Sequence, residues 1–329
     1  MNNDIVLEVK NLSKTFKVTK PNSERTLKEK ILGGVKEFKA VDNVSFTIKK
    51  GEIFGLVGES GSGKSTVART IIKLYNVTNG KMNFLGQDIT KITKTQQRAL
   101  AKDMQMIFQD PFASVNPRMT VEEIIGEGLK IHQPNLNKKQ IRAKVVELLK
   151  KVGLSEYHIS RYPHEFSGGQ LQRIGIARSL AVKPKFIIAD ESISALDVSI
   201  QAQVVNLLKD LKDDFGLTYL FIAHDLAMMK YISDKIGVMY KGKLVEVAPV
   251  NEIYTNPIHP YTKSLLSAIP HADPIYESQR IRQEYNAKQE HNYDYKVQEK
   301  TPEYHKLNEE HIVYCTKQEL NKWTSNWYL

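Results

Sequence analysis

The chain has 329 residues, of which 41% are hydrophobic and 26% are charged, and this is ordinary for a globular protein of about two domains. It contains no run of roughly 18 charge-free apolar residues, so we expect no membrane-spanning helix. The segment Met1–Asp4 lacks the basic and apolar regions of a secretory signal, and we expect the protein to stay in the cytoplasm. The net charge of +10 fits nucleic acid, an anionic membrane face, anionic nucleotides or solubility alone, and cannot choose among them.

The N-terminal part of the chain predicts short strands around a polar insertion. Residues 5–9 and 44–48 have strand patterns, and the second alternates apolar and polar side chains. The segment 17–39 between them is polar and rich in lysine, so we predict a loop or a loosely ordered arm. Residues 53–57 then form a compact apolar run that predicts a buried strand.

A phosphate-binding loop follows this strand. Residues 58–65 fit the pattern G-x-x-x-x-G-K-[ST] in full, and apolar residues from Val67 to Leu74 recur with helical spacing. Glycines let backbone N–H groups approach a triphosphate, Lys64 would reach the β- and γ-phosphates, and the Ser65 hydroxyl would bind Mg²⁺. The alternative is a chance glycine-rich turn. The candidate nucleotide-binding residues are Gly58, Glu59, Ser60, Gly61, Ser62, Gly63, Lys64, Ser65 and Thr66.

The middle and the following section predict an open α/β sheet. Residues 102–182 are expected to be mostly helical, with apolar stripes over 121–129 and 141–152. Two continuous apolar runs, 186–189 and 219–223, predict strands buried on both faces of a parallel sheet, with a helix between them. In such sheets ligands bind at the carboxyl ends of the strands.

An acidic pair, Asp190 and Glu191, directly follows the first of these strands. Asp190 can support Mg²⁺ through water, and Glu191 can polarise the attacking water. The alternative is a helix N-terminus that favours acidic residues. The complete phosphate loop upstream favours the first interpretation.

The segment Phe166-Ser167-Gly168-Gly169-Gln170 resembles the signature of the ABC ATPase family, with Phe in place of the usual Leu. Independently of the family, Ser167 followed by two glycines predicts a second anion-binding helix start. The resemblance implies a RecA-like α/β P-loop NTPase core with an antiparallel β subdomain and an inserted helical subdomain. It also implies head-to-tail pairing, in which Ser167, Gly168, Gly169 and Gln170 close over the ATP of another cassette.

Other motifs of the family match one by one. The resemblance makes Gln109 the glutamine that senses Mg²⁺ and the attacking water, and His224 the histidine that contacts the γ-phosphate. Asp197 ends a segment, 194–197, that resembles the loop crossing the dimer interface. Phe16 lies where the family places an aromatic residue that stacks on adenine. Taken alone, His224 fits an ordinary strand end and Phe16 an ordinary core position.

Two longer segments, 107–118 and 254–266, resemble the oligopeptide/dipeptide permease ATPases, and the insertion before the phosphate loop is more like their F-type subunit. The resemblance implies a nucleotide-binding domain over 4–250 and a C-terminal extension over 251–329. It also implies ATP and Mg²⁺ as cofactors. The expected activity is an ATPase that powers peptide import at the cytoplasmic membrane face. The expected partners are a second, D-type ATPase subunit, two transmembrane permease subunits and, indirectly, an extracellular solute-binding protein.

Three alternatives stay open at this point. Very similar ATPases drive nickel or metal-chelate uptake. A soluble ABC ATPase acting on nucleic acid usually carries zinc-binding cysteines, a long coiled coil or two cassettes, and this sequence has none of them, so we expect no nucleic-acid partner. A catalytically silent cassette is disfavoured by the intact Lys64, Glu191 and His224.

The composition changes after about residue 275, where Glu, Lys, Gln and Tyr dominate. We expect this tail to fold against the core or a partner, with Trp323, Trp327 and Tyr328 as anchors, and the alternative is a disordered terminus. Cys315, the only cysteine, excludes an intramolecular disulfide and a cysteine-cluster metal site. Its polar surroundings suggest that it is incidental.

Overall fold

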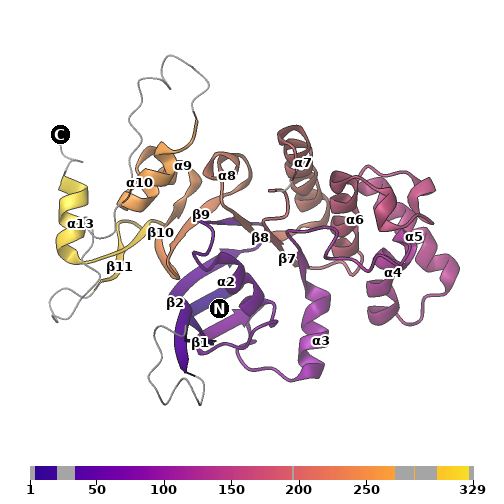
Figure 1. Ribbon diagram of the computed structural model, residues 1–329, viewed down its shortest axis with the longest axis horizontal. Coiled ribbons are helices and arrows are strands. Elements are labelled where there is room, and N and C mark those ends of the chain that lie inside the picture. Colours follow the sequence, from indigo (N-terminus) through magenta and orange to yellow (C-terminus); the bar gives the residue numbers. More distant parts are fainter. Residues whose placement is uncertain (1–3, 21–33, 195, 271–284, 286–301, 326–329) are drawn as a thin grey trace. The chain divides into compact units, whose positions relative to one another are not determined.

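The structure is a computed structural model that describes residues 4–20, 34–194, 196–270, 285 and 302–325 (Figure 1). Within these ranges we find no helix whose length and apolar character would allow it to cross a membrane. The chain divides into two compact units. The first comprises Met1–Val6, Ile48–Leu56 and Ile92–Lys235, and the second comprises Leu7–Thr47, Val57–Lys91 and Ile236–Leu329.

A buried sheet forms the centre of the first unit. Its strands follow the order β3 (Ile53–Val57), β8 (Thr218–Ala223), β7 (Phe186–Asp190) and β6 (Met104–Ile107). β7 pairs in parallel with both β6 and β8. Every residue of β7 and β8 is buried, which explains their continuous apolar runs and confirms the predicted parallel sheet.

The predominantly helical character predicted for residues 102–182 is confirmed by helices over 121–132, 138–151 and 168–180, but one strand there was not predicted. β6 lies inside the segment 102–182, which was expected to be mostly helical. Its four residues follow α3 (Lys94–Asp103) directly, so helical and strand patterns merge at this point. A strand this short carries too little periodicity to be separated from a neighbouring helix.

Three further helices of the first unit lie side by side in Figure 1: α4 (Val121–His132), α5 (Lys138–Lys151) and α6 (Gly168–Leu180). The predicted apolar stripes of α4 and α5 are buried, as expected for amphipathic helices. Thr120, Asn137 and Ser167 each accept a hydrogen bond from the backbone N–H three residues on. These caps fix the three helix starts. The unit also contains α7 (Val198–Phe215) and α8 (Leu226–Ile232).

An antiparallel sheet occupies the N-terminal part of the second unit. Its strands follow the order β2 (Val35–Lys49), β1 (Ile5–Thr19), β4 (Asn79–Phe84) and β5 (Gln87–Asp88). β1 and β2 extend into both ends of the segment 17–39, so the prediction of a loop was wrong there, and residues 21–33 are outside the described part of the chain. The Lys20 N–H donates to the Gly34 carbonyl at 2.8 Å. Backbone hydrogen bonds can hold such polar strands without an apolar alternation to reveal them.

The C-terminal part of the second unit builds on a second set of strands. Their order is β11 (Glu303–Lys306), β12 (Ile312–Cys315), β10 (Lys243–Pro249) and β9 (Lys235–Tyr240). β12 pairs antiparallel with β10, with Val313 opposite Glu246. Helices α9 (Val250–Thr255), α10 (Pro260–Ser267) and α13 (Lys317–Thr324) complete this region. For residues 302–325 the expectation that the tail folds against the core is therefore confirmed.

An apolar cluster explains why the tail docks. Ile258, Val313 and Cys315 are buried together, and Leu307, Leu320 and Trp323 pack against them. Trp323 thus serves as the predicted anchor, while Trp327 and Tyr328 are outside the described residues. The interpretation of Cys315 as incidental was wrong, because its side chain is 2% exposed and belongs to this cluster.

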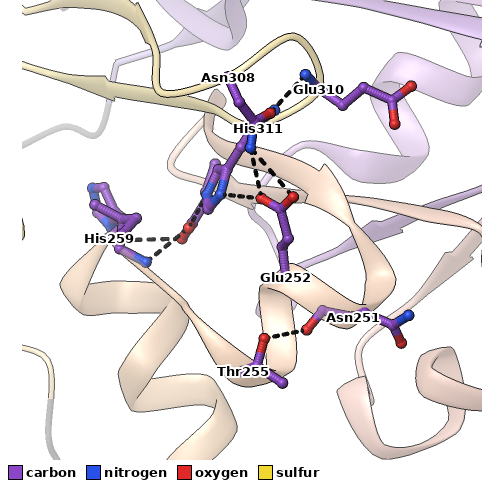
Figure 2. A network of polar contacts seen from close by, with 9 residues as sticks. Asn251, Glu252, Thr255, His259, Asn308, Glu310 and His311 are labelled. Carbon is purple, nitrogen blue, oxygen red and sulfur yellow. Dashed lines mark hydrogen bonds and ion pairs between the residues drawn. The ribbon is translucent and has the colours of Figure 1, made fainter. Parts of the chain in front are cut away.

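A buried polar network also fastens β12 to the rest of the second unit (Figure 2). The His311 ring Nε2 lies 2.8 Å from Glu246 Oε1, and its Nδ1 lies 2.8 Å from Glu252 Oε2. Carboxylates accept hydrogen bonds, so this geometry favours a proton on both ring nitrogens and a charged imidazole. Burial alone lowers the pKa of His311, but the hydrogen bonds and charges of Glu246 and Glu252 outweigh it and raise the pKa above its usual value. The Asn308 side-chain oxygen accepts a hydrogen bond from the backbone N–H of His311 at 2.7 Å, and its amide nitrogen donates to the Glu252 carboxylate.

Candidate functional site

The phosphate loop lies between β3 and α2 (Lys64–Ile71), and its backbone requires glycine. Gly58, Gly61 and Gly63 have φ angles of 151°, 79° and 108°, which L side chains rarely adopt. A Cβ at Gly58 would lie 2.2 Å from the Met239 carbonyl oxygen, and one at Gly63 would lie 2.5 Å from the Ala40 carbonyl oxygen. Close backbone packing therefore requires glycine at positions 58 and 63, and the φ angle favours glycine at position 61.

Lys64 holds its charge inside this loop. Its side chain is 3% exposed, and Nζ donates to the Gly58 carbonyl at 2.8 Å and to the Glu59 carbonyl at 2.9 Å. A hydrogen bond from the Gly242 N–H to the Ser62 carbonyl, at 2.8 Å, ties the far side of the loop to the turn after β9. The loop is thus a fixed backbone structure with a cation at its centre.

The loop residues fit an anionic phosphate and a hard cation. Gly63 provides no side-chain cap for α2, and the first turn of α2 has no acidic residue, so the helix start favours an anion. The Ser62 hydroxyl is buried and has no hydrogen-bond partner among the described residues. Ser65, in the first turn of α2, carries an oxygen donor of the kind that Mg²⁺ prefers, and so does Asp190 of the first unit.

The acidic pair lies at the end of β7, in the first unit. Asp190 is the last residue of the strand and is 2% exposed, and Glu191 is half-buried with a φ of 45°. The Glu191 N–H donates to the Ile222 carbonyl of β8 at 2.9 Å, and its carbonyl accepts from Ser194 Oγ at 2.8 Å. A turn follows the pair and α7 begins only at Val198, so the alternative of a helix start is wrong. A non-glycine residue held in the left-handed region suggests a functional constraint.

Gln109 and Glu191 are in direct contact. Gln109 follows β6 by two residues, and its Nε2 donates to Glu191 Oε2 at 2.8 Å. Parallel pairing of β6 with β7 brings the two strand ends, and hence these side chains, to one edge of the sheet. Arg178 of α6 donates to the Ser114 carbonyl at 2.5 Å and lies 5.9 Å from the centre of the Phe108 ring. This residue links the helix of the signature to the segment around Gln109.

The signature forms a helix start, as predicted. Ser167 is exposed, its hydroxyl accepts from the Gln170 N–H at 3.3 Å, and the Gln170 side chain accepts from the Ser167 N–H at 3.1 Å. A Cβ at Gly169 would lie 2.9 Å from an Ile200 methyl group, so a larger residue at position 169 would push the N-terminus of α6 away from α7. Gly168 is half-buried.

The remaining predicted residues lie at element ends or on a strand. His224 is exposed directly after β8, and Asp197 is exposed directly before α7. Phe16 lies on β1, with its ring centre 5.2 Å from that of Tyr75 in an edge-to-face arrangement. The Lys14 ammonium lies 4.8 Å from the centre of the Phe16 ring. The roles that the resemblance gives to His224, Asp197 and Phe16 stay predictions. The phosphate loop and the acidic pair belong to different compact units.

Sequence reasoning missed two residues beside the predicted site. Tyr75 pairs with Phe16, and its only signal was a second aromatic side chain near the end of the helix after the loop. The Tyr261 hydroxyl lies 3.0 Å from the backbone nitrogen of Glu59, inside the phosphate loop. Tyr261 belongs to the segment 254–266, which the sequence analysis used only as evidence of the family resemblance.

Comparisons with known proteins identify the family of this chain. Residues 41–194 match the family model described as ABC transporter, and residues 245–295 match that of the oligopeptide/dipeptide transporter, C-terminal region. The chain is 60% identical over 283 residues to the oligopeptide transport ATP-binding protein OppF of Bacillus subtilis, covering 85% of this chain and 91% of that protein. It is 55% identical over 277 residues to the dipeptide transport ATP-binding protein DppF of Lactococcus lactis, covering 84% of each.

A solved structure supports the same assignment. The dimeric, post-hydrolysis structure of the ATP-binding cassette MJ0796 with ADP and Pi is similar, with a TM-score of 0.65 and 27% identity. The similarity covers 74% of this chain and 98% of that one. From its sequence, its fold and these relatives, the chain belongs to the family of ATP-binding subunits of oligopeptide/dipeptide ABC transporters.

Proposed function

We propose that this chain binds ATP and hydrolyses it, and that hydrolysis powers the uptake of oligopeptides or dipeptides through separate membrane subunits. The contact between Gln109 and the strained Glu191, at the carboxyl end of a parallel sheet, carries the hydrolytic part of this proposal. The names of the relatives, which are oligopeptide and dipeptide transport ATP-binding proteins, support the cargo.

Each side chain has a defined part in this reaction. Lys64 and the N–H groups of the loop bind the phosphates, and Glu191 takes the proton of the attacking water. Gln109 orients the Glu191 carboxylate through the 2.8 Å hydrogen bond, and His224 donates to the γ-phosphate. Ser65, Gln109 and Asp190 would hold Mg²⁺, which would supply positive charge to neutralise the phosphates. Phe16, beside Tyr75, stacks on the adenine ring.

The partners follow from the exposed signature. Ser167 lies at an exposed helix start, and we propose that it faces the phosphate loop of a second, different ATPase subunit. Two transmembrane permease subunits would hold this pair at the cytoplasmic face of the membrane. In this scheme residues 4–250 form the nucleotide-binding domain and residues 251–329 the extension. Full transport activity from this chain and the permease subunits, without another ATPase, would contradict the heterodimer.

Substitution of Lys64 tests the proposed function. Lys64→Ala removes the fixed charge in the loop, and we expect ATP affinity to fall by about 10- to 100-fold, because hydrogen bonds to charged groups contribute about 1.5–3 kcal/mol. ATP titration of the purified full-length chain by calorimetry measures this. Lys139→Ala, at an exposed position of α5, is the matched control and should bind like the wild type. Equal affinities of both variants would rule out the phosphate loop as the nucleotide site.

A further inference from the structure

The C-terminal extension reaches the phosphate loop through one side chain. Tyr261, in the first turn of α10, is 1% exposed, and its hydroxyl oxygen accepts a hydrogen bond from the Glu59 N–H at 3.0 Å. Its ring centre lies 4.5 Å from that of Tyr240 and 5.3 Å from that of Tyr285. Burial raises the pKa of the Tyr261 hydroxyl above its usual value, so it stays protonated and acts as a neutral acceptor.

The peptide unit between Gly58 and Glu59 makes hydrogen bonds to both Tyr261 and Lys64. The Glu59 N–H and the Gly58 carbonyl belong to the same planar peptide, so they point in opposite directions. The N–H donates to Tyr261 at 3.0 Å, and the carbonyl accepts from Lys64 Nζ at 2.8 Å. A rotation of this peptide would break both hydrogen bonds at once.

We propose that Tyr261 is a positioning residue for the phosphate loop, whose hydroxyl fixes the Gly58–Glu59 peptide and thereby the Lys64 ammonium. The inference rests on the proposed function, since it assigns a purpose to a contact with the nucleotide-binding loop. Tyr261 acts through the backbone and through Lys64, not on ATP itself. Its loss should weaken nucleotide binding more than the rate of hydrolysis at saturating ATP.

The surroundings of α10 keep Tyr261 in place. The Glu246 carboxylate accepts the N–H groups of Ile258 and His259 at 2.8 and 3.1 Å, just before the helix. The His259 ring nitrogen Nδ1 accepts the Tyr261 N–H at 3.1 Å. Glu246 in turn binds His311 of β12 at 2.8 Å. A continuous set of hydrogen bonds therefore connects the docked tail to the phosphate loop, entirely within the second unit.

Two Tyr→Phe substitutions separate the role of the hydroxyl from loss of buried volume. Tyr261→Phe keeps the packed ring and removes the acceptor. Tyr219→Phe is the matched control, because Tyr219 is also 1% exposed and its hydroxyl has no hydrogen-bond partner among the described residues. In the full-length chain we expect Tyr261→Phe to weaken ATP binding by about 5- to 10-fold, the loss of roughly one buried hydrogen bond. The kcat should stay within about twofold, and Tyr219→Phe should leave ATP affinity unchanged.

Hydrogen exchange of the loop amides provides a second readout that needs no nucleotide. Without added ATP, the Glu59 amide should exchange about tenfold faster in Tyr261→Phe than in the wild type or in Tyr219→Phe, because its hydrogen bond is lost. Glu59→Pro removes the same hydrogen bond from the donor side, and Tyr261→Phe should add no further loss of ATP affinity in that background.

The outcomes distinguish this inference from the proposed function. If Tyr261→Phe binds ATP like the wild type while Lys64→Ala does not, the positioning role is wrong and the ATPase assignment stands. If Tyr261→Phe lowers only the melting temperature, and exchange at Glu59 is unchanged, Tyr261 is a packing residue and the inference fails. If the wild type binds no ATP, the proposed function fails, and the exchange experiment still tests the contact with Glu59.

Discussion

Polar groups in two regions of this chain are held in opposite ways. At the ends of β6, β7 and β8, Gln109 and His224 are exposed and Glu191 is half-buried. Under the C-terminal extension, Glu246 and the His311 side chain are at most 1% exposed and bind each other. The first set is accessible to water and to a ligand, whereas the second set is shielded from solvent inside the protein.

This difference separates chemistry from stability. Replacing a half-exposed group removes a chemical function and leaves the packed core intact. Replacing one member of a buried pair leaves an uncompensated charge in the interior, and this destabilises the folded state. The two regions should therefore respond differently to substitutions of similar size.

Glu191→Gln should have the largest effect, and on hydrolysis alone. The amide keeps the shape of the side chain but cannot accept the proton of the attacking water, so we expect kcat to fall by about 10²- to 10⁴-fold with ATP affinity nearly unchanged. Phosphate release by the assembled transporter, with the site of the partner ATPase disabled, measures this. Glu147→Gln, exposed on α5, is the control. A variant that hydrolyses ATP at close to the wild-type rate would show that Glu191 is not the base.

His311→Leu should have the converse effect, on stability. It leaves the buried Glu246 carboxylate without its charged partner, and we expect the free energy of unfolding to fall by about 3–5 kcal/mol. The kcat at saturating ATP should stay within about threefold. Urea unfolding of the full-length chain gives the first quantity, and His164→Leu, at an exposed position, is the control. A loss below about 1 kcal/mol would mean that the network contributes little to the docking of β12.

The contribution of His311 should also depend on pH. Its pKa in the folded chain lies above the ordinary 6.5, so the folded state holds the proton more tightly than the unfolded state does. The stabilisation is therefore complete below about pH 6.5 and is lost as pH rises through the raised pKa, at up to about 1.4 kcal/mol per unit. The charged groups facing His311 are Glu246 of β10 and Glu252 of α9.

The difference in unfolding free energy between the wild type and His311→Leu, measured from pH 6 to pH 9, isolates this effect. Groups that titrate equally in both proteins cancel in the difference. We expect this difference in unfolding free energy to become smaller as pH rises. A difference that is flat or grows with pH would show that His311 is not charged in the folded protein.

Much of the catalytic region could be predicted from the sequence because its signals are local. The loop at 58–65, the strands at 186–189 and 219–223 and the helix start at Ser167 each depend on residue types within a few positions. β6 was missed because four residues show too little periodicity beside a helix.

The contacts of the extension could not be predicted in the same way. The hydrogen bond from Glu59 to Tyr261 joins residues 202 positions apart, and that from His311 to Glu246 joins residues 65 apart. Neither pair has a spacing pattern, since only the tertiary fold brings them together. A buried histidine in a polar tail looks, in sequence, like an exposed one.

Cys315 offers the smallest effect and a direct test of the docked tail. Its thiol packs with Ile258 and Val313, and burial raises its pKa to about 12, so little thiolate forms at neutral pH. Cys315→Ala should cost about 1 kcal/mol of stability and leave ATP hydrolysis unchanged, because it removes a small buried side chain that has no part in the proposed reaction. In the wild type the thiol should resist a disulfide reagent at pH 8 and react at once after unfolding in urea. Rapid, complete reaction in the folded chain would mean that β12 and α13 leave the core readily.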